Sequence, residues 1–469
     1  MLCNGVSCNA LDYAYPATRP CLRGCCLSQS GRSIMGYAIS HTSPPYLQRM
    51  LSASLSSAAV RPVRLLHTSD WHLGHELFGH TREAEHDAFL AWLSDTLAQT
   101  QADALLVTGD IYDVANPSVP AQQRLYRFIA ALRQRLPRLQ IIIIGGNHDS
   151  ALRIDLPGAL VDADVHLIGG LPRHEREPDM ERICIPLKNT DGVPAAWLAA
   201  VPFCRPSDLD ATGLSGLYAR IMSALADRAR GLPMVLSGHL HVAGGEVSEL
   251  SERRLVIGGE EAAATDLFDP RAAYVALGHL HRPQTLKAAM PIRYAGSPFP
   301  LSAAERGYRH CVTLAILEQS GTRLETLPIP RSVDFLRIPE NGALTLDDAV
   351  NAIQALTLPD RPRAQQPFVE IAILINGPEP HLQARILAAL EGKPVRLTRI
   401  RRVTPQSGQT TLLSDPTRDL SDLRAEDIFI AMHQREHQTP PSEALSRAFA
   451  ELLLEASREE DSAQTDGKN

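Results

Sequence analysis

IIIIGGNHD, residues 141–149, is the most informative stretch of this chain. Four consecutive isoleucines form an apolar run of strand length, and two glycines then lead into Asn147, His148 and Asp149. A continuous apolar run of this kind is typical of a strand that is buried on both faces of a sheet. In open α/β sheets, functional groups gather beyond the carboxyl ends of such strands. The three polar residues after the glycines are therefore candidates for a functional site.

The same arrangement, an apolar run followed by a small turn and polar side chains, occurs four more times. The stretches are VRLLHTSDWH (63–72), ALLVTGDIYD (104–113), MVLSGHLH (234–241) and YVALGHLH (274–281). A single Gly-Asp or Gly-His pair carries almost no information, because a histidine at a strand end is more often a hydrogen-bonded core or surface residue. Five such strand ends in this order are hard to obtain without a shared site. We therefore expect their polar side chains to converge.

These polar side chains are chemically mixed, which bears on the metal that they suit. Oxygen donors alone would indicate magnesium or calcium, whereas mixed nitrogen and oxygen donors indicate manganese, iron or zinc in an open site. One carboxylate between two cations can hold them about 3.5 to 4 Å apart, where they bind a phosphate and activate a water. Asp110 is the candidate bridge. The seven candidate ligands are Asp70, His72, Asp110, Asn147, His239, His279 and His281.

Two amphipathic segments separate the first three strands. The first has apolar residues on one helical face from Phe89 to Leu97, and the second has them at intervals of three and four from Leu125 onward, after Ser118 as a helix start. This alternation of strands and helices favours right-handed crossovers and a largely parallel sheet. Within the first strand, alternation points His67 toward the sheet, so we expect a packed, hydrogen-bonded histidine there.

After about residue 330 the strand-end motifs stop, and the sequence indicates a small α/β domain. We expect residues 345–356 to form a helix, and residues 368–375 and 395–403 to form strands around a helix that contains Ile386 and Leu390. The last strand carries four arginines that could touch DNA phosphates, although a solvated strand face or a partner contact explains them equally well. They are Arg396, Arg399, Arg401 and Arg402.

The C-terminal part of the chain has a different character. Residues 404–422 are rich in Ser, Thr, Asp and Gln and are expected to form a linker. Two amphipathic segments follow, and because a helix with one apolar stripe must bury it, they either dock on the small domain or bind a partner. Their apolar residues are Ile428, Phe429 and Met432 in the first segment, and Leu445, Phe449, Leu452, Leu453 and Ala456 in the second.

The overall composition excludes some classes of protein. The 469 residues include 46 Lys and Arg against 53 Asp and Glu, a net charge of -7, so the chain does not coat nucleic acid by charge alone and must hold any anionic substrate locally. Its apolar runs fall short of the about 18 residues that a membrane span needs. Cys184, Cys204 and Cys311 stand singly, which fits a reducing compartment and predicts a cytoplasmic protein.

Residues 1–62 form an appendage without helical or alternating apolar periodicity. They carry five arginines and a single acidic residue, Asp12, and they lack the pattern of a secretory signal. An organelle transit peptide and a start codon assigned too far upstream both explain this composition. Our hypothesis is that translation begins near Met50 or just before Val63.

The ordered motifs resemble those of the calcineurin-like metallophosphoesterases, and the neighbouring residues are similar to those of the SbcD subunits of bacterial exonucleases. The general motifs bear only on the chemistry, whereas HLHRPQ and GSPFPLS narrow the choice to the nuclease subunits. The resemblance runs from about Val63 to the end of the chain. The matching stretches are HTSDWHLG (67–74), REAEHDAFLAWL (82–93), GDIYD (109–113), GGNHDS (145–150), YVALGHLHRPQ (274–284) and YAGSPFPLSAAE (294–305).

This resemblance implies an α/β fold, a four-layer α/β/β/α metallophosphoesterase sandwich with a small α/β capping domain and C-terminal amphipathic helices. The implied division of the chain is an extension over residues 1–62, a nuclease domain over 63–330, a capping domain over 331–410, and a linker with partner-binding helices over 411–469. The capping domain would limit the shape of DNA that reaches the site.

The resemblance also implies roles for individual residues. Of two divalent ions, manganese or alternatively magnesium, the first would bind Asp70, His72, Asp110 and His281, and the second Asp110, Asn147, His239 and His279. The catalytic residues would be His148, which contacts the scissile phosphate and assists proton transfer to the leaving oxygen, and Asp149, which orients it. Asp113 would support the ligands without binding an ion, and His241 would be an additional polar neighbour.

The implied function is that of a nuclease subunit of an SbcCD complex, an ATP-dependent 3′ to 5′ exonuclease on duplex DNA and an endonuclease on single strands and hairpins, in repair, recombination and replication. Its partners would be an SbcC-type ATPase, bound at the base of the coiled coil, and a second copy of the chain in a heterotetramer, with no membrane. One alternative is a phosphoesterase for a nucleotide or phosphoprotein, and another is a non-catalytic scaffold that bridges DNA ends.

Overall fold

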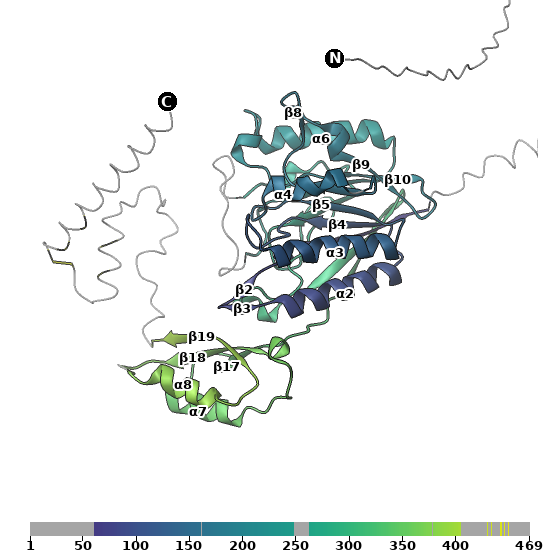
Figure 1. The fold of residues 1–469 in the computed structure, drawn as a ribbon. Helices are drawn as coiled ribbons and strands as arrows, with labels where there is room; N and C mark the ends of the chain where they lie inside the picture. The colour runs from purple at the N-terminus through teal and green to yellow at the C-terminus, as the bar shows by residue number, and fades with distance from the viewer. Residues whose placement is uncertain are drawn as a thin grey trace, which may run out of the picture. The chain divides into compact units, whose positions relative to one another are not determined.

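The computed structural model describes residues 61–160, 162–247, 262–377 and 379–404, together with Phe429, His433, Pro441, Ser442, Leu445 and Phe449 (Figure 1). The proposed appendage, except for its last two residues, and most of the C-terminal linker and helices lie outside these residues. Within the described part, none of the helices has the length and apolar character needed to span a membrane.

The first sheet contains the first three strands predicted from the sequence. Its order is β16-β15-β1-β4-β5-β6, in which β1, β4, β5 and β6 run parallel and β15 and β16 add antiparallel pairs at one side. Helices α2 (Glu83–Gln99) and α3 (Val119–Arg135) connect the central strands, and Ser118 caps α3 by accepting a hydrogen bond from the amide of Ala121. The strands are β1 (Val63–Thr68), β4 (Ala104–Thr108), β5 (Gln140–Ile144), β6 (Val165–Ile168), β15 (Cys311–Glu318) and β16 (Gly321–Pro328).

The second sheet contains the strands of the two remaining motifs. Its order is β13-β14-β12-β11-β10-β9, with parallel pairing from β10 through β11 and β12 to β14, and helix α6 (Gly213–Ala229) packs against it. The strands are β9 (Cys184–Lys188), β10 (Pro194–Ala199), β11 (Met234–His239), β12 (Tyr274–Gly278), β13 (Gln284–Leu286) and β14 (Ile292–Tyr294). The shorter elements are β2 (Glu76–Leu77), β3 (His80–Thr81), α4 (Ala151–Asp155), η1 (Leu156–Leu160), β7 (Arg173–His174), β8 (Glu177–Pro178), α5 (Met180–Ile183), η2 (Pro206–Asp208), η3 (Thr265–Leu267), η4 (Ala303–Gly307) and η5 (Arg363–Gln365).

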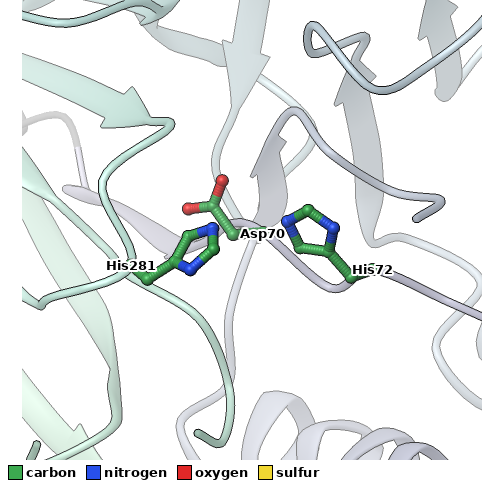
Figure 2. A group of neighbouring side chains, drawn as sticks. All are labelled: Asp70, His72 and His281. Carbon is green, nitrogen blue, oxygen red and sulfur yellow. The ribbon is translucent and has the colours of Figure 1, made fainter. Parts of the chain in front are cut away.

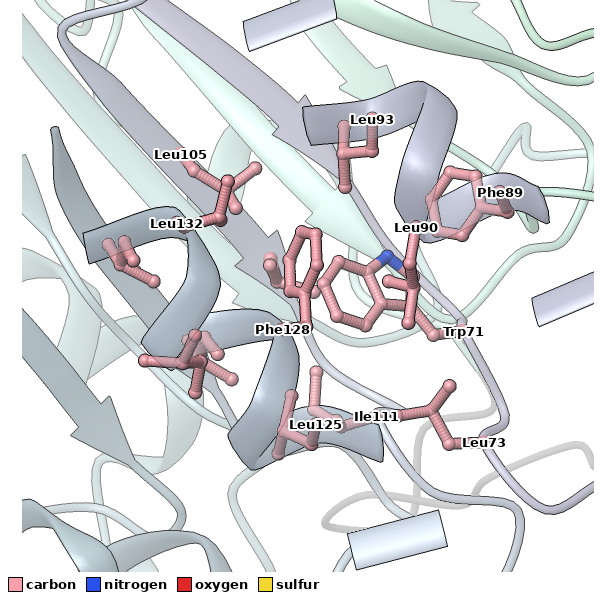
Figure 3. Packing of buried hydrophobic residues seen from close by; sticks show 14 of the residues in the cluster. Trp71, Leu73, Phe89, Leu90, Leu93, Leu105, Ile111, Leu125, Phe128 and Leu132 are labelled. Atoms are coloured by element: carbon pink, nitrogen blue, oxygen red, sulfur yellow. The ribbon is translucent and has the colours of Figure 1, made fainter. Parts of the chain in front are cut away.

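Three apolar clusters show that these elements form four layers. One cluster joins the first sheet to α2 and α3 (Figure 3), a second joins the second sheet to α6, and a third lies between the two sheets and includes Leu65, Leu106 and Ile142 of the first sheet with Leu198 and Ala276 of the second. The order of layers is therefore helix, sheet, sheet, helix. This confirms the predicted α/β/β/α sandwich.

A third, smaller sheet follows in the chain. Its three parallel strands, β17 (Phe335–Ile338), β18 (Phe368–Leu374) and β19 (Arg396–Val403), pack with α7 (Leu346–Ala355) and α8 (Leu382–Leu390) around their own core. The predicted small α/β domain is therefore present, and the strand β17 is an addition to it. The exact domain boundaries stay predictions.

The four arginines of the last strand differ in exposure. Arg399 and Arg402 are exposed, and Arg401 is half-buried with its guanidinium 3.9 Å from the carboxylate of Glu370. The side chain of Arg396 is buried and lies over the ring of Phe368, 3.8 Å from its centroid. The guanidinium of Arg396 is therefore used in packing, and contact of the four arginines with DNA stays a prediction.

Candidate metal centre

The loops after five strands of the two large sheets bring the predicted ligands together in two groups. In the first cluster, Asp70, His72 and His281 each offer one ligand atom within 4.8 Å of the others, and all three residues are buried. Figure 2 shows the carboxylate of Asp70 between the two imidazole rings. Asp70 and His72 follow β1, whereas His281 follows β12, so this cluster joins the two sheets.

The second cluster consists of Asp110, His239 and His279, whose ligand atoms likewise lie within 4.8 Å of one another. The amide oxygen of Asn147 adjoins it, 2.9 Å from Nε2 of His239 and 3.2 Å from Nδ1 of His279. Asn147 follows β5 of the first sheet, and the histidines end β11 and follow β12 of the second. All seven predicted ligands therefore meet in one place, and their binding of ions stays a prediction.

Asp110 lies between the two clusters. Its Oδ2 atom is 3.6 Å from Nε2 of His72 in the first cluster and 3.4 Å from Nε2 of His239 in the second. Its Oδ1 atom accepts a hydrogen bond from the amide of His148 at 2.9 Å, which holds the carboxylate in place. This position fits a carboxylate that two cations share.

The local backbone explains why the first motif presents two ligands from alternate residues. Asp70 and His72 both adopt left-handed backbone conformations, and their amides donate to the carbonyl oxygens of Gly109 and Asp110. Trp71 turns the other way, into the core, where its ring packs edge-on 5.7 Å from the rings of both Phe89 and Phe128 (Figure 3). The buried tryptophan thus fixes the loop that carries the two ligands.

Gly109 is required by close approach as well as by its backbone. Its φ angle is +89°, and a Cβ atom at this position would overlap Nδ1 of His239. That nitrogen lies 2.9 Å from the carbonyl oxygen of Thr108, which fixes the orientation of the His239 ring. The glycine before Asp110 therefore lets the second sheet bring its histidine close to the first.

The charges of the site are set by burial and by mutual attraction. Burial raises the pKa of Asp70 and lowers the pKa values of His72 and His279. Burial alone would also lower the pKa of His239, but Asp110 outweighs it and raises that pKa to about 9. Burial likewise opposes ionisation of Asp110, yet His239 and His72 hold its pKa well below its usual range.

Two buried atoms of the first cluster indicate that a cation fits. Oδ2 of Asp70 and Nε2 of His72 have no hydrogen-bond partner. Buried polar atoms of this kind are costly unless they are paired or bind a metal. Together with the mixed oxygen and nitrogen donors of both clusters, they suit divalent transition metals.

Comparison with known proteins agrees with this geometry. A model of the calcineurin-like phosphoesterase family matches residues 63–283, and the model described as type 5 capsule protein repressor C-terminal domain, SbcD_C, matches residues 331–437. The SbcD subunit of the nuclease SbcCD from Rhodobacter capsulatus is 41% identical over 79% of this chain and 94% of its own length. The same subunit of Escherichia coli K12 is 33% identical over 78% of this chain and 92% of its own length, and that of Bacillus subtilis 168 is 36% identical over 54% and 66%.

The chain belongs to the SbcD family. It carries the calcineurin-like phosphoesterase domain of that family, whose members depend on metal ions, and the two buried clusters are the candidate sites for them.

The two predicted catalytic residues of this SbcD chain lie beside the clusters, and their side chains have different hydrogen-bond partners. Nδ1 of His148 donates to the carbonyl oxygen of Asp113 at 2.7 Å, and its ring centroid lies 4.9 Å from that of His72. The carboxylate of Asp149 accepts hydrogen bonds from the amides of Ile111, Tyr112 and Gly146. Asp149 therefore fixes the backbone of the loops around His148, and the catalytic roles of both residues stay predictions.

Other predicted neighbours take the places expected for them. The carboxylate of Asp113 lies 3.3 Å from Nδ1 of His72, and the ring centroid of His241 is 6.4 Å from that of His279. His67 is buried, with hydrogen bonds to the hydroxyl groups of Tyr274 and Thr108.

The sequence did not reveal the role of Glu305. This carboxylate is fully buried and lies 3.0 Å from Nδ1 of His281. The only signal was its place at the end of the stretch YAGSPFPLSAAE.

Proposed function

We propose that this chain is the nuclease subunit of an SbcCD-type complex and hydrolyses phosphodiester bonds of DNA. The observation that carries the proposal is the pair of buried clusters with Asp110 between them, because a shared carboxylate is the arrangement that binds two metal ions. Two relatives named as nuclease subunits match this chain over more than 90% of their own length. The net negative chain gains its affinity for a phosphodiester from the cations rather than from its own charge.

The residues divide the chemical work between them. Divalent ions held by the seven ligands would polarise a phosphodiester and lower the pKa of a water, with manganese as the proposed ion and magnesium as the alternative. His148 is half-buried beside the first cluster, and its Nδ1 proton is held by the carbonyl oxygen of Asp113. Its Nε2 atom is then the nitrogen that contacts the scissile phosphate and passes a proton to the leaving oxygen.

We further propose the activities and the partner of the family: ATP-dependent 3′ to 5′ exonuclease action on duplex DNA, endonuclease action on single strands and hairpins, and an SbcC-type ATPase. This work belongs to repair, recombination and replication in the cytoplasm, where the buried free thiols of Cys184, Cys204 and Cys311 stay reduced.

The test is cleavage of an end-labelled hairpin DNA by the full chain with Mn²⁺, Mg²⁺ or EDTA, with and without the ATPase and ATP. We expect cutting that requires the metal and rises with the ATPase and ATP, and a His239→Ala control that does not cut. Absence of cutting with every metal would overturn the proposal. Hydrolysis of nucleotides or a phosphoprotein with DNA left intact would instead establish the phosphoesterase alternative.

The C-terminal segments are the proposed binding site for the ATPase. Phe429 and Phe449 both lie in helical conformation and their rings stack 4.1 Å apart, so the two amphipathic segments contact each other. A chain that ends at Ser414 should lose co-purification with the ATPase while retaining its nuclease fold. Full recovery of the ATPase with the shortened chain would show that the binding site lies elsewhere.

A second copy of the chain is the proposed occupant of an apolar surface at the start of α3, on α4 and at the start of η1. Val119, Leu152 and Leu156 expose 64%, 73% and 72% of their surface, and the guanidinium of Arg153 donates to the amide oxygen of Asn116, which ties α4 to the loop before α3. Light scattering should find a dimer that the double variant L152E/L156E converts to a monomer. Leu387→Glu, at an exposed leucine of α8, is the matched control and should leave the dimer intact.

A further inference from the structure

The two histidines of the first cluster share a feature that the second cluster lacks: each has a carboxylate behind its ring. Nδ1 of His281 donates to Oε1 of Glu305 at 3.0 Å. Nδ1 of His72 lies 3.3 Å from Oδ1 of Asp113. In the second cluster, Nδ1 of His239 faces a neutral group, the carbonyl oxygen of Thr108.

One short segment anchors both carboxylates. The amide of Leu301 donates to Oε2 of Glu305 at 2.8 Å, so the glutamate is held at both oxygens. The carbonyl oxygen of Leu301 lies 3.2 Å from Nε2 of His75, and Nδ1 of His75 donates in turn to Asp113 at 2.9 Å. Leu301 itself is buried, 4% exposed, which makes this anchor rigid. Both supports of the first cluster therefore depend on the loop before η4.

A carboxylate in this position has two effects on an imidazole ligand. It fixes the tautomer that carries the proton on Nδ1, which leaves the lone pair of Nε2 for a cation, and its negative charge strengthens the donation to that cation. Removal of such a partner typically weakens metal affinity about 10- to 100-fold. The two clusters should therefore respond differently to the loss of these carboxylates.

We propose that Glu305 and Asp113 are positioning residues that hold His281 and His72 toward the first metal ion, and that the backbone of Leu301 couples them. This inference rests on the pair of metal ions in the proposed function. It deepens that function, because the binding of one of the two ions then depends on the segment after β14 that contains Leu301 and Glu305. Neither carboxylate binds an ion itself in this scheme.

The test is calorimetric titration of the metal-free full chain with Mn²⁺. Glu305→Gln keeps the shape of the side chain and removes its charge. We expect this variant to bind one of the two ions with about 10-fold lower affinity, and to keep the affinity for the other ion within about twofold of the wild type. Glu305→Ala should lower the affinity for the same ion by up to about 100-fold. Asp113→Asn should also lower the affinity for that ion. The matched control is Glu370→Gln, which neutralises another buried carboxylate in the third sheet and should change neither affinity.

The outcomes separate a positioning role from a purely structural one. An equal loss of affinity for both ions, together with a lower unfolding temperature, would show that Glu305 only stabilises the packing of the fold and would overturn the proposal. So would affinities for both ions that stay within about twofold of the wild type in Glu305→Gln and Glu305→Ala. The titration needs no DNA, so a wild-type chain that binds two ions but cuts no DNA would refute the nuclease function and leave the role of Glu305 standing.

Discussion

The two large sheets contribute different chemistry to one site. The loops of the first sheet supply all the oxygen donors, Asp70, Asp110 and Asn147, with a single imidazole, His72, whereas the second sheet supplies only imidazoles. The imidazoles of the second sheet are His239, His279 and His281. Each of the two clusters takes ligands from both sheets, so neither sheet alone completes a cluster. The site therefore exists only where the two sheets pack together.

This packing is mostly apolar but includes a polar link. The cluster between the sheets contains residues of both, and through it His67 of β1 reaches the hydroxyl group of Tyr274 on β12 at 2.8 Å. Both residues are fully buried. Ions bound across the sheet ends would add to the free energy that holds the sheets together, because they bind only the folded state.

Removal of the side chain that lies between the two clusters should have the largest effect. In Asp110→Ala both clusters lose a ligand, and we expect loss of bound Mn²⁺ and a fall in hairpin cleavage of about 1000-fold or more. Asp70→Ala, which affects the first cluster alone, should retain one ion per chain. The measurements are metal content by mass spectrometry and cleavage rate. Two ions retained in Asp110→Ala would show that the clusters are independent.

A variant beside the site should separate metal binding from chemistry. His148→Ala leaves all seven ligands in place, so the number of bound ions should not change, while cleavage should fall about 100- to 10,000-fold because the proton donor is lost. Metal titration and single-turnover cleavage measure the two quantities. Cleavage by His148→Ala at the wild-type rate would show that His148 takes no part in the reaction.

The ligands could be predicted from the sequence because each lies at or just beyond the end of a largely apolar, buried strand. The helix α3 was predictable for a similar local reason, namely its three-and-four spacing and the cap at Ser118. The role of Glu305 was not, since a buried glutamate in a short 3₁₀ helix has no periodic or motif signature and its partner His281 is 24 residues away in the chain. Local sequence patterns thus identified the candidate ligands, and only the tertiary structure showed which side chains contact one another.

Two features of the structure could not be predicted for the same reason. The carboxylate of Asp149 binds backbone amides of the loops around His148, its neighbour in the sequence. Arg396 is the one buried arginine of the four in β19 and packs against Phe368. Proximity in sequence is a poor guide to side-chain contacts, because alternate residues of a strand or turn face different surroundings.

Metal binding should stabilise the two large sheets together and leave the third sheet unaffected. At Mn²⁺ concentrations about 100 times the dissociation constant, the free energy of unfolding should rise by about 2.7 kcal/mol for each bound ion. Hydrogen exchange should slow in β1, β4, β11 and β12, and not in β17, β18 or β19. EDTA should reverse the change. Slower exchange confined to one large sheet would contradict the assembly of the site across both.

The polar link between the sheets should make their packing sensitive to acid. Burial lowers the pKa of His67 to about 3, whereas in the unfolded chain its pKa is near 6.5. Between these values the unfolded state binds a proton at His67 that the folded state does not, so this residue makes the free energy of unfolding fall by about 2 kcal/mol from pH 6.5 to pH 5, in addition to what other groups contribute. The measurement is urea unfolding in EDTA at both pH values.

His67→Asn cannot take up this proton, so the drop between pH 6.5 and pH 5 should be smaller by about 2 kcal/mol than in the wild type, even if the variant is less stable at both pH values. Tyr274→Phe is the matched control, since it removes the hydroxyl partner of His67 but keeps a histidine that titrates on unfolding, and it should retain the wild-type drop. An equal drop in His67→Asn and the wild type would show that other groups govern the acid sensitivity. The link between the sheets would then contribute to their packing without making it depend on pH.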